Sequence, residues 1–307
     1  MTADHRFVLV GDNSFHGISH LSQEKARTRG EGVLDPGNAA GLVQLALENG
    51  AEGFMFSVSP TTLAILRATR RRPSGSSMDL YPIVPYAYEY VSKSTRSGGI
   101  TGMAKSFMAE TLRSWNIAAI WKSAAGVLTT SPPDLLEAYV RYEASRVRSA
   151  AGGGAAMRSM LLHEVVTDMA LALDLKWVFE AHLKCSRRLK MSAGFETRNF
   201  SSLVNKLRDW QMPMEGLTIA APFNSVGFLM TPSKEECERA LAHARGATVI
   251  AMSVLAAGYL KLPEAVEYVS GLPHLSGVVA GISNESQAVE TFGSLSKRFR
   301  PPKTERV

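Results

Sequence analysis

Five side chains that can donate or accept protons follow short apolar runs of the sequence, at the points where predicted strands end. His163 ends the run MLL, and a neutral imidazole there can exchange a proton or polarise a carbonyl group near neutral pH. Asp12, Tyr86, Glu89 and Glu196 stand at equivalent places after three other apolar runs. Carboxyl, phenol and imidazole groups are the usual carriers of general acid–base catalysis. The residue types therefore indicate an enzyme that acts on a small molecule.

A set of parallel strands must bring these groups together. Short apolar segments alternate with longer amphipathic segments, which is the pattern of a parallel sheet with crossover helices. No GxGxxG motif opens the first helix, so we interpret the pattern as a (β/α)8 barrel rather than an open doubly wound sheet. The active site of such a barrel lies at the carboxyl ends of its strands. We expect strands at residues 7–10, 53–58, 80–85, 158–163, 190–195, 217–221, 248–253 and 277–281.

The alternation is broken once, at residues 98–150, where helical spacing continues through two successive segments. We interpret this stretch as a helical insertion after the third strand, within a single domain that spans residues 1–307. Residues 118–121 could instead form a ninth strand, which the barrel interpretation excludes. The other predicted helices cover residues 38–49, 61–71, 201–210, 234–244, 263–270 and 286–298, and the second helix of the insertion covers 134–148.

Composition restricts the partners and the compartment. The net charge is +6 and the pI about 9.3, but the basic residues are scattered, apart from the triplet at residues 70–72. We therefore expect no nucleic-acid partner. The two cysteines, Cys185 and Cys237, form neither a disulfide framework nor a zinc motif. With no signal peptide and no apolar run long enough for a membrane span, the sequence predicts a cytoplasmic protein without a membrane partner.

Simpler structural roles are open for some of these residues. Asp12 can cap a turn, since aspartate is common in such positions. Glu164 should point away from His163 along the strand, and it can form a salt bridge to the next strand–helix unit. Glu196 should lie inside the barrel if Gly194 does, and its alternative role is an ion pair with Arg198.

Four segments in the second half of the chain, between residues 160 and 292, resemble the aldo-keto reductases. The strand MLLHE is similar to the strand that ends in the family's catalytic histidine, which gives His163 that role. SAGFETRNF at 192–200, IAMSVLAAGYL at 250–260 and VVAGISNESQAVETF at 278–292 are similar to three cofactor-binding segments. The resemblance implies contacts to the nicotinamide amide, the pyrophosphate and the adenosine end of the cofactor. Together with Asn224, at the end of the sixth strand, the candidate cofactor residues are Asn199, Ser253, Leu255, Gly258, Gly281, Ser283 and Glu290.

The first half departs from the family pattern. The aspartate and tyrosine that the family has after strand two, and the lysine after strand three, are absent from FMFSVSPTTL and IVPYAYEY. Met252 stands in place of an aromatic residue, and Ala220 in place of a glutamine. No arginine or lysine near Ser283 corresponds to the family's 2′-phosphate clamp. The cofactor implied is therefore NAD or NADP without a marked preference for NADP.

Three functions fit these observations. The first is a nicotinamide-dependent oxidoreductase for a small carbonyl or alcohol substrate, with a non-standard site in which His163 works with Tyr86, Tyr88 or Glu89. The second is a lyase or isomerase that uses Asp12, His163 and Glu196 as acid and base. With His16 these residues could also hold a divalent metal, although no HxH or HxxxE spacing supports this role. The third is an inactive cofactor-binding subunit, which the polar strand ends disfavour.

Overall fold

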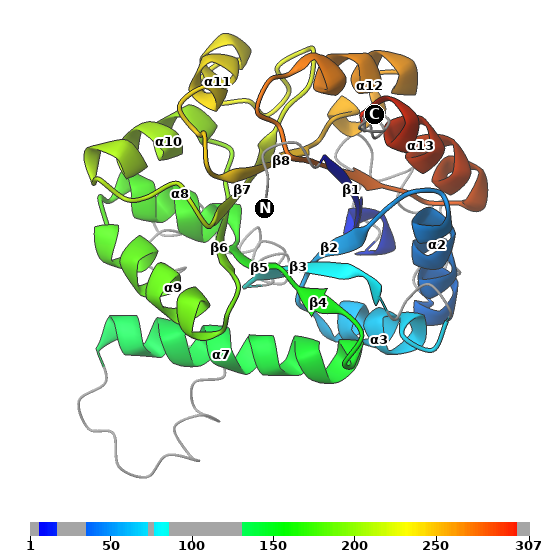
Figure 1. The fold of residues 1–307 in the computed structure, drawn as a ribbon, viewed down its shortest axis with the longest axis horizontal. Helices are drawn as coiled ribbons and strands as arrows, with labels where there is room; N and C mark the ends of the chain where they lie inside the picture. The colour runs from blue at the N-terminus through cyan, green and yellow to red at the C-terminus, as the bar shows by residue number, and fades with distance from the viewer. Residues whose placement is uncertain (1–5, 17–34, 73–76, 86–130, 300–307) are drawn as a thin grey trace, which may run out of the picture.

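The barrel predicted from the sequence is present. A computed structural model describes residues 6–16, 35–72, 77–85 and 131–299 of the chain. Its strands form one parallel sheet that closes on itself, because β2, at one end of the strand order, also pairs with β3 near the other end (Figure 1). The strands are β1 (Phe7–Gly11), β2 (Gly53–Ser57), β3 (Asp79–Val84), β4 (Ala156–Met157), β5 (Ser159–Leu162), β6 (Ser192–Glu196), β7 (Leu217–Pro222), β8 (Thr248–Met252) and β9 (Gly277–Gly281).

The predicted fourth strand is divided into β4 and β5. Both segments pair with β3, so they occupy one place in the barrel, and the number of strand positions remains eight. Arg158 separates them, and its side chain forms an ion pair with Asp79 at 2.8 Å. The strand was expected to continue through His163. Instead that residue caps the next helix, although its N–H still bonds to the Val84 carbonyl at 2.8 Å.

Helices surround the sheet and supply its crossovers (Figure 1). The sequence pattern predicted no residue ranges for two of these helices, which lie between residues 164 and 188. None of the described helices is long and apolar enough to span a membrane. The helices are α2 (Pro36–Glu48), α3 (Pro60–Thr69), α7 (Pro132–Ala151), α8 (Glu164–Ala172), α9 (Lys176–Arg188), α10 (Phe200–Asp209), α11 (Lys234–Leu241), α12 (Leu262–Gly271) and α13 (Glu285–Arg298), with short 3-10 turns η1 (Asn13–His16) and η4 (Ala256–Gly258).

Helix α7 is a regular member of the outer ring. It packs against α3 on one side and α9 on the other, in the place of the third crossover helix (Figure 1). The second helix of the expected 98–150 insertion is therefore part of the barrel itself. The rest of that expectation, including the possible strand at 118–121, lies outside the described residues.

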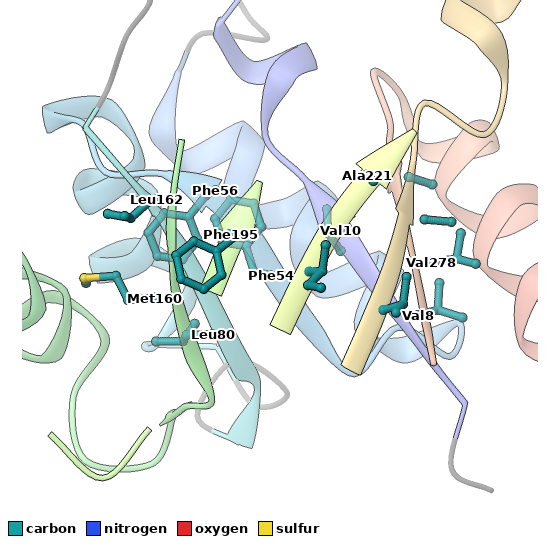
Figure 2. Close-up of a cluster of buried hydrophobic side chains, with 14 of the residues drawn as sticks. Val8, Val10, Phe54, Phe56, Leu80, Met160, Leu162, Phe195, Ala221 and Val278 are labelled. Carbon is teal, nitrogen blue, oxygen red and sulfur yellow. The ribbon is translucent and has the colours of Figure 1, made fainter. Parts of the chain in front are cut away.

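Side chains alternate between two cores along each strand. Val8, Val10, Phe54, Phe56 and Phe195 point outward and are buried between the sheet and the helices (Figure 2). The intervening residues fill the barrel interior, where the Phe7 and Tyr81 rings stack with centroids 5.7 Å apart. Continuing this alternation to the carboxyl ends of the strands places inward residues at the barrel mouth.

His182 links the outer ring to the two strands that carry the candidate catalytic groups. It lies on α9, is fully buried, and donates its Nε2 proton to the Met160 carbonyl of β5 at 2.9 Å. Its ring also contacts Phe195 of β6 edge-on, with centroids 5.5 Å apart. Burial lowers the pKa of His182 to about 4.

We expect acid to weaken the fold through His182. The unfolded chain takes up a proton near the ordinary pKa of 6.5, whereas the native ring stays neutral until about 4. Stability should therefore fall as the pH decreases through this interval, by up to roughly 3 kcal/mol more in the wild type than in His182→Gln. Urea unfolding of both proteins at several pH values measures the difference. Parallel pH profiles would contradict this role of His182.

Candidate active site

His163 lies at the barrel mouth with its ring orientation fixed. It directly follows β5, and its Nδ1 accepts a hydrogen bond from the Val165 N–H at 3.2 Å. The neutral ring therefore carries its proton on Nε2. The side chain is 19% exposed, so the ring is not sealed in the core. Burial is the main reason that the pKa of His163 is lowered, which favours the neutral form.

Glu196 stands beside His163, at the end of the neighbouring strand β6. Its Oε2 lies 3.9 Å from Nε2 of His163 and accepts a hydrogen bond from the Glu164 N–H at 3.3 Å. The side chain is 12% exposed. Burial, and then the negative charge of Glu164, raise the pKa of Glu196 to about 8. This carboxyl group therefore remains protonated near neutral pH, as few carboxyl groups do.

Arg198 and Glu164 form a two-point ion pair at the rim. The Arg198 Nε donates to one carboxylate oxygen of Glu164 at 2.7 Å, and the Nη2 atom lies 2.5 Å from the other. The predicted salt bridge from Glu164 to the next unit is confirmed. The alternative pairing of Arg198 with Glu196 is replaced by this bridge. Because Glu164 takes up the charge of Arg198, the arginine offsets the raised pKa of Glu196 only in part.

Asp168 organises the loop after β6, a role that the sequence did not reveal. Its carboxylate accepts hydrogen bonds from the Thr197 hydroxyl, from the Arg198 N–H at 3.2 Å and from the Asn199 side chain. Burial raises the pKa of Asp168. The only sequence signal was that Asp168 and Thr197 are polar residues next to strand ends. Asn199, expected to contact the cofactor amide, has its side chain directed to Asp168 here.

Asp12 joins the same mouth from β1. Its Oδ2 accepts a hydrogen bond from the Ser57 N–H at 2.8 Å and lies 3.1 Å from the His16 Nε2. Asp12 is buried, with 4% of its surface exposed. Its negative charge acts to raise the pKa values of both His163 and Glu196. The structure therefore brings together Asp12, His163 and Glu196. The other two candidates, Tyr86 and Glu89, lie outside the described residues, as does Tyr88.

The loop after β8 has an unusual backbone. Ser253, Ala256 and Ala257 have left-handed φ angles of 51°, 45° and 59°, and Gly258 has 92°. Leu255, directly before Ala256, has a right-handed conformation with φ −88° and ψ 6°. The N–H groups of Ala256 and Gly258 bond within the loop, to the Ser253 and Leu255 carbonyls, both at 2.8 Å. A Cβ atom on Gly258 would meet nothing within 4 Å, so the loop is open there.

The candidate adenosine-binding residues lie at the end of β9 and the start of α13. Gly281 is exposed and pairs with Gly11 of β1. Asn284 caps α13 by accepting the Gln287 N–H at 2.9 Å, and the Gln287 side chain in turn accepts the Ser283 N–H at 3.0 Å. Glu290 is exposed on α13.

Asn224 has a different position from the other candidate cofactor residues. It is fully buried, and its amide bonds both the N–H and the carbonyl of Phe228, at 2.7 and 2.8 Å. A longer contact of 3.4 Å reaches the Ser253 carbonyl. The Asn224 side chain thus stabilises the loop after β7 and connects it to the loop after β8 by a hydrogen bond.

Comparison with known proteins supports the fold. No family model and no curated protein sequence matches the chain. Two solved structures, each described as a "putative aldo-keto reductase" from Pseudomonas aeruginosa, are similar, with TM-scores of 0.57 and identities of 15% and 14%. The alignments cover 95% of this chain and 90% and 89% of those chains. At this identity the likeness establishes a shared barrel fold.

Among the described residues no group of three or more histidine, cysteine or acidic side chains could hold a metal ion.

The protonated state of Glu196 should be visible as a cost in stability. Its pKa is raised from 4.5 to about 8, so its contribution to stability is full below pH 4.5 and is lost as the pH rises towards 8. We expect Glu196→Gln to unfold at least about 2 °C above the wild type at alkaline pH, and at nearly the same temperature in acid. Calorimetric scans across this pH range test the expectation. Glu267→Gln, which changes an exposed glutamate, is the matched control and should follow the wild type.

Proposed function

We propose that this protein is a nicotinamide-dependent oxidoreductase that reduces a small carbonyl compound, or oxidises the corresponding alcohol. One observation carries the proposal. A carboxyl group with a pKa of about 8, on Glu196, lies 3.9 Å from a histidine whose proton is on the facing nitrogen. Two protonated groups separated by this distance can both donate to one carbonyl oxygen of a substrate.

In the proposed reaction His163 and Glu196 together replace the tyrosine that the family uses as its acid: one donates a hydrogen bond and the other donates the proton. The His163 Nε2–H donates a hydrogen bond that polarises the substrate carbonyl. As negative charge develops on that oxygen, the O–H bond of Glu196 breaks and its proton passes to the oxygen, giving the alcohol. Glu196 is left as a carboxylate and is reprotonated from solvent. A proton donor with a pKa near the working pH is well suited to this step.

Two loops form the proposed dinucleotide site. The loop after β8, which is open at Gly258, would hold the pyrophosphate, while Gly281 and Ser283 would lie at the adenosine end. When bound, such a cofactor supplies the hydride that the carbonyl carbon receives. Because no cationic side chain accompanies Ser283 in the sequence, we expect NADH and NADPH to bind with similar affinity.

The proposed proton transfer predicts an activity that is lost in alkali. The rate constant kcat/KM for carbonyl reduction should fall as the pH rises through about 8, where Glu196 loses its proton. Glu196→Gln should lower kcat by about 10²–10⁴, because a positioned acid contributes this much. The assay follows oxidation of NADH or NADPH with a panel of small aldehydes and ketones.

Glu164→Gln is the informative companion variant. Removing this negative charge, and releasing Arg198 from it, should lower the pKa of Glu196 and move the alkaline limb of the profile to lower pH. Activity that survives Glu196→Gln within about tenfold would contradict the assignment of Glu196 as the acid. So would a profile that Glu164→Gln leaves in place.

Cofactor binding can be tested independently of the substrate. A Cβ atom on Gly281 would already approach the Ser14 hydroxyl to 3.0 Å, so Gly281→Leu should project its side chain onto the proposed cofactor surface. We expect dissociation constants for NADH and NADPH to rise at least about tenfold, with the unfolding temperature little changed. Gly271→Leu adds the same side chain where no atom lies within 4 Å and serves as control. Titrations monitored by fluorescence measure both variants.

The Asp12–His16 contact favours one alternative, a non-redox lyase or isomerase. It adds a second carboxylate–imidazole pair, at 3.1 Å, to the His163–Glu196 pair at the same mouth. An acid and a base on one substrate would suit an elimination or a proton shift. Failure of the wild type to bind either nicotinamide cofactor would favour this function over the reduction.

A further inference from the structure

A basic groove runs over the outer surface of the barrel between α3 and α7. Its first part, with a volume of about 410 Å³, is lined by residues of both helices, including Leu63, Arg67, Tyr142 and Arg146. The second part, about 330 Å³, is lined by Arg70, Arg71 and residues 151–154. These two helices pack side by side in the outer ring (Figure 1). We refer to the two parts together as the α3–α7 groove.

The two parts adjoin through one hydrogen bond. Arg70, which lines the second part, donates from Nη1 to the carbonyl of Ser149, which lines the first, at 3.2 Å. The groove therefore follows α3 and α7 towards their carboxyl ends. Its position on the helices separates it from the candidate active site at the strand ends.

The charge of the groove is unbalanced. Four arginines line it, and no aspartate or glutamate is among the lining residues. Arg146 is held by both carboxylate oxygens of the buried Glu143, at 2.9 and 2.8 Å. Arg67, Arg70 and Arg71 are exposed and form no ion pair within the described part of the chain. Guanidinium groups are the preferred protein partners of phosphate, because they donate two parallel hydrogen bonds.

Two further features suit a ligand with phosphates and a planar ring. Tyr142 is 43% exposed, with the Arg146 guanidinium 5.5 Å from its ring centroid. At the other end, a Cβ atom on Gly153 would meet nothing within 4 Å, and Gly152 has a φ of 80°. The Gly152 N–H bonds to the Arg148 carbonyl at 3.0 Å, but the absence of side chains leaves the backbone open to a ligand at Gly153.

We propose that the α3–α7 groove binds a nucleotide, with its phosphates on Arg67, Arg70 and Arg71 and its ring on Tyr142. Each part of the groove has the volume of a small-molecule site rather than of an extended polymer track. This site is separate from the proposed dinucleotide surface at Gly281, so the two can be tested apart.

The test is calorimetric titration with ATP, with pyrophosphate and with adenosine, all in the Gly281→Leu background. We expect ATP and pyrophosphate to bind, and adenosine to bind much more weakly. Arg67→Gln combined with Arg71→Gln should weaken ATP and pyrophosphate at least about tenfold. Tyr142→Leu should weaken ATP but leave pyrophosphate unchanged.

A matched double variant controls for loss of charge at helix ends. Arg187 and Arg208 are also exposed and lie in the last turns of α9 and α10, so Arg187→Gln with Arg208→Gln should bind ATP as the parent does. Absence of ATP binding to the parent protein, or binding that the Arg67 and Arg71 changes leave intact, would overturn the proposal. A single-stranded oligonucleotide that binds more tightly than ATP, and is lost in the same variant, would assign the groove to nucleic acid instead.

Discussion

Closure of the sheet is the constraint on which the candidate site depends. Because β1 pairs with β9 as well as with β2, the inward side chain at each strand end faces the same small mouth. Below that mouth the interior is filled by apolar groups such as the stacked Phe7 and Tyr81 rings. A polar inward residue at a strand end is then partly desolvated whatever its identity. This burial is the largest cause of the shifted pKa values of both His163 and Glu196.

Charged side chains around the mouth add to or oppose the effect of burial on the pKa of Glu196. Glu164 and Asp12 both act to raise the pKa of Glu196, whereas Arg198 opposes them. The two-point bridge between Arg198 and Glu164 holds that opposing charge at the rim. A carboxyl group kept neutral in this way weakens the fold above its ordinary pKa. Such a cost is typical of functional sites, where stability is exchanged for reactivity.

Much of this arrangement follows from local patterns in the sequence. The position after an apolar run predicted His163 and Asp12 at the mouth, and period-two alternation predicted that Glu196 lies inward with Gly194. The roles of Asp168 and Asn224 could not be predicted in this way. Each is defined by hydrogen bonds to a loop whose course depends on the packed barrel, to Thr197 and Arg198 in one case and to Phe228 in the other. The break at Arg158 likewise depends on its tertiary partner, Asp79.

Part of the family resemblance has a physical explanation. In two of the four similar segments, around Ser253–Gly258 and at Gly281, the proposed contacts are made by backbone groups. A backbone contact requires only a conformation, such as the left-handed angles at Ala256 and Ala257, and many sequences can supply it. Side-chain roles require a particular chemical group, and here the proposed acid is a carboxyl group on a different strand. The same barrel fold, shared here with a TM-score of 0.57 at 15% identity, can therefore carry different acid–base groups.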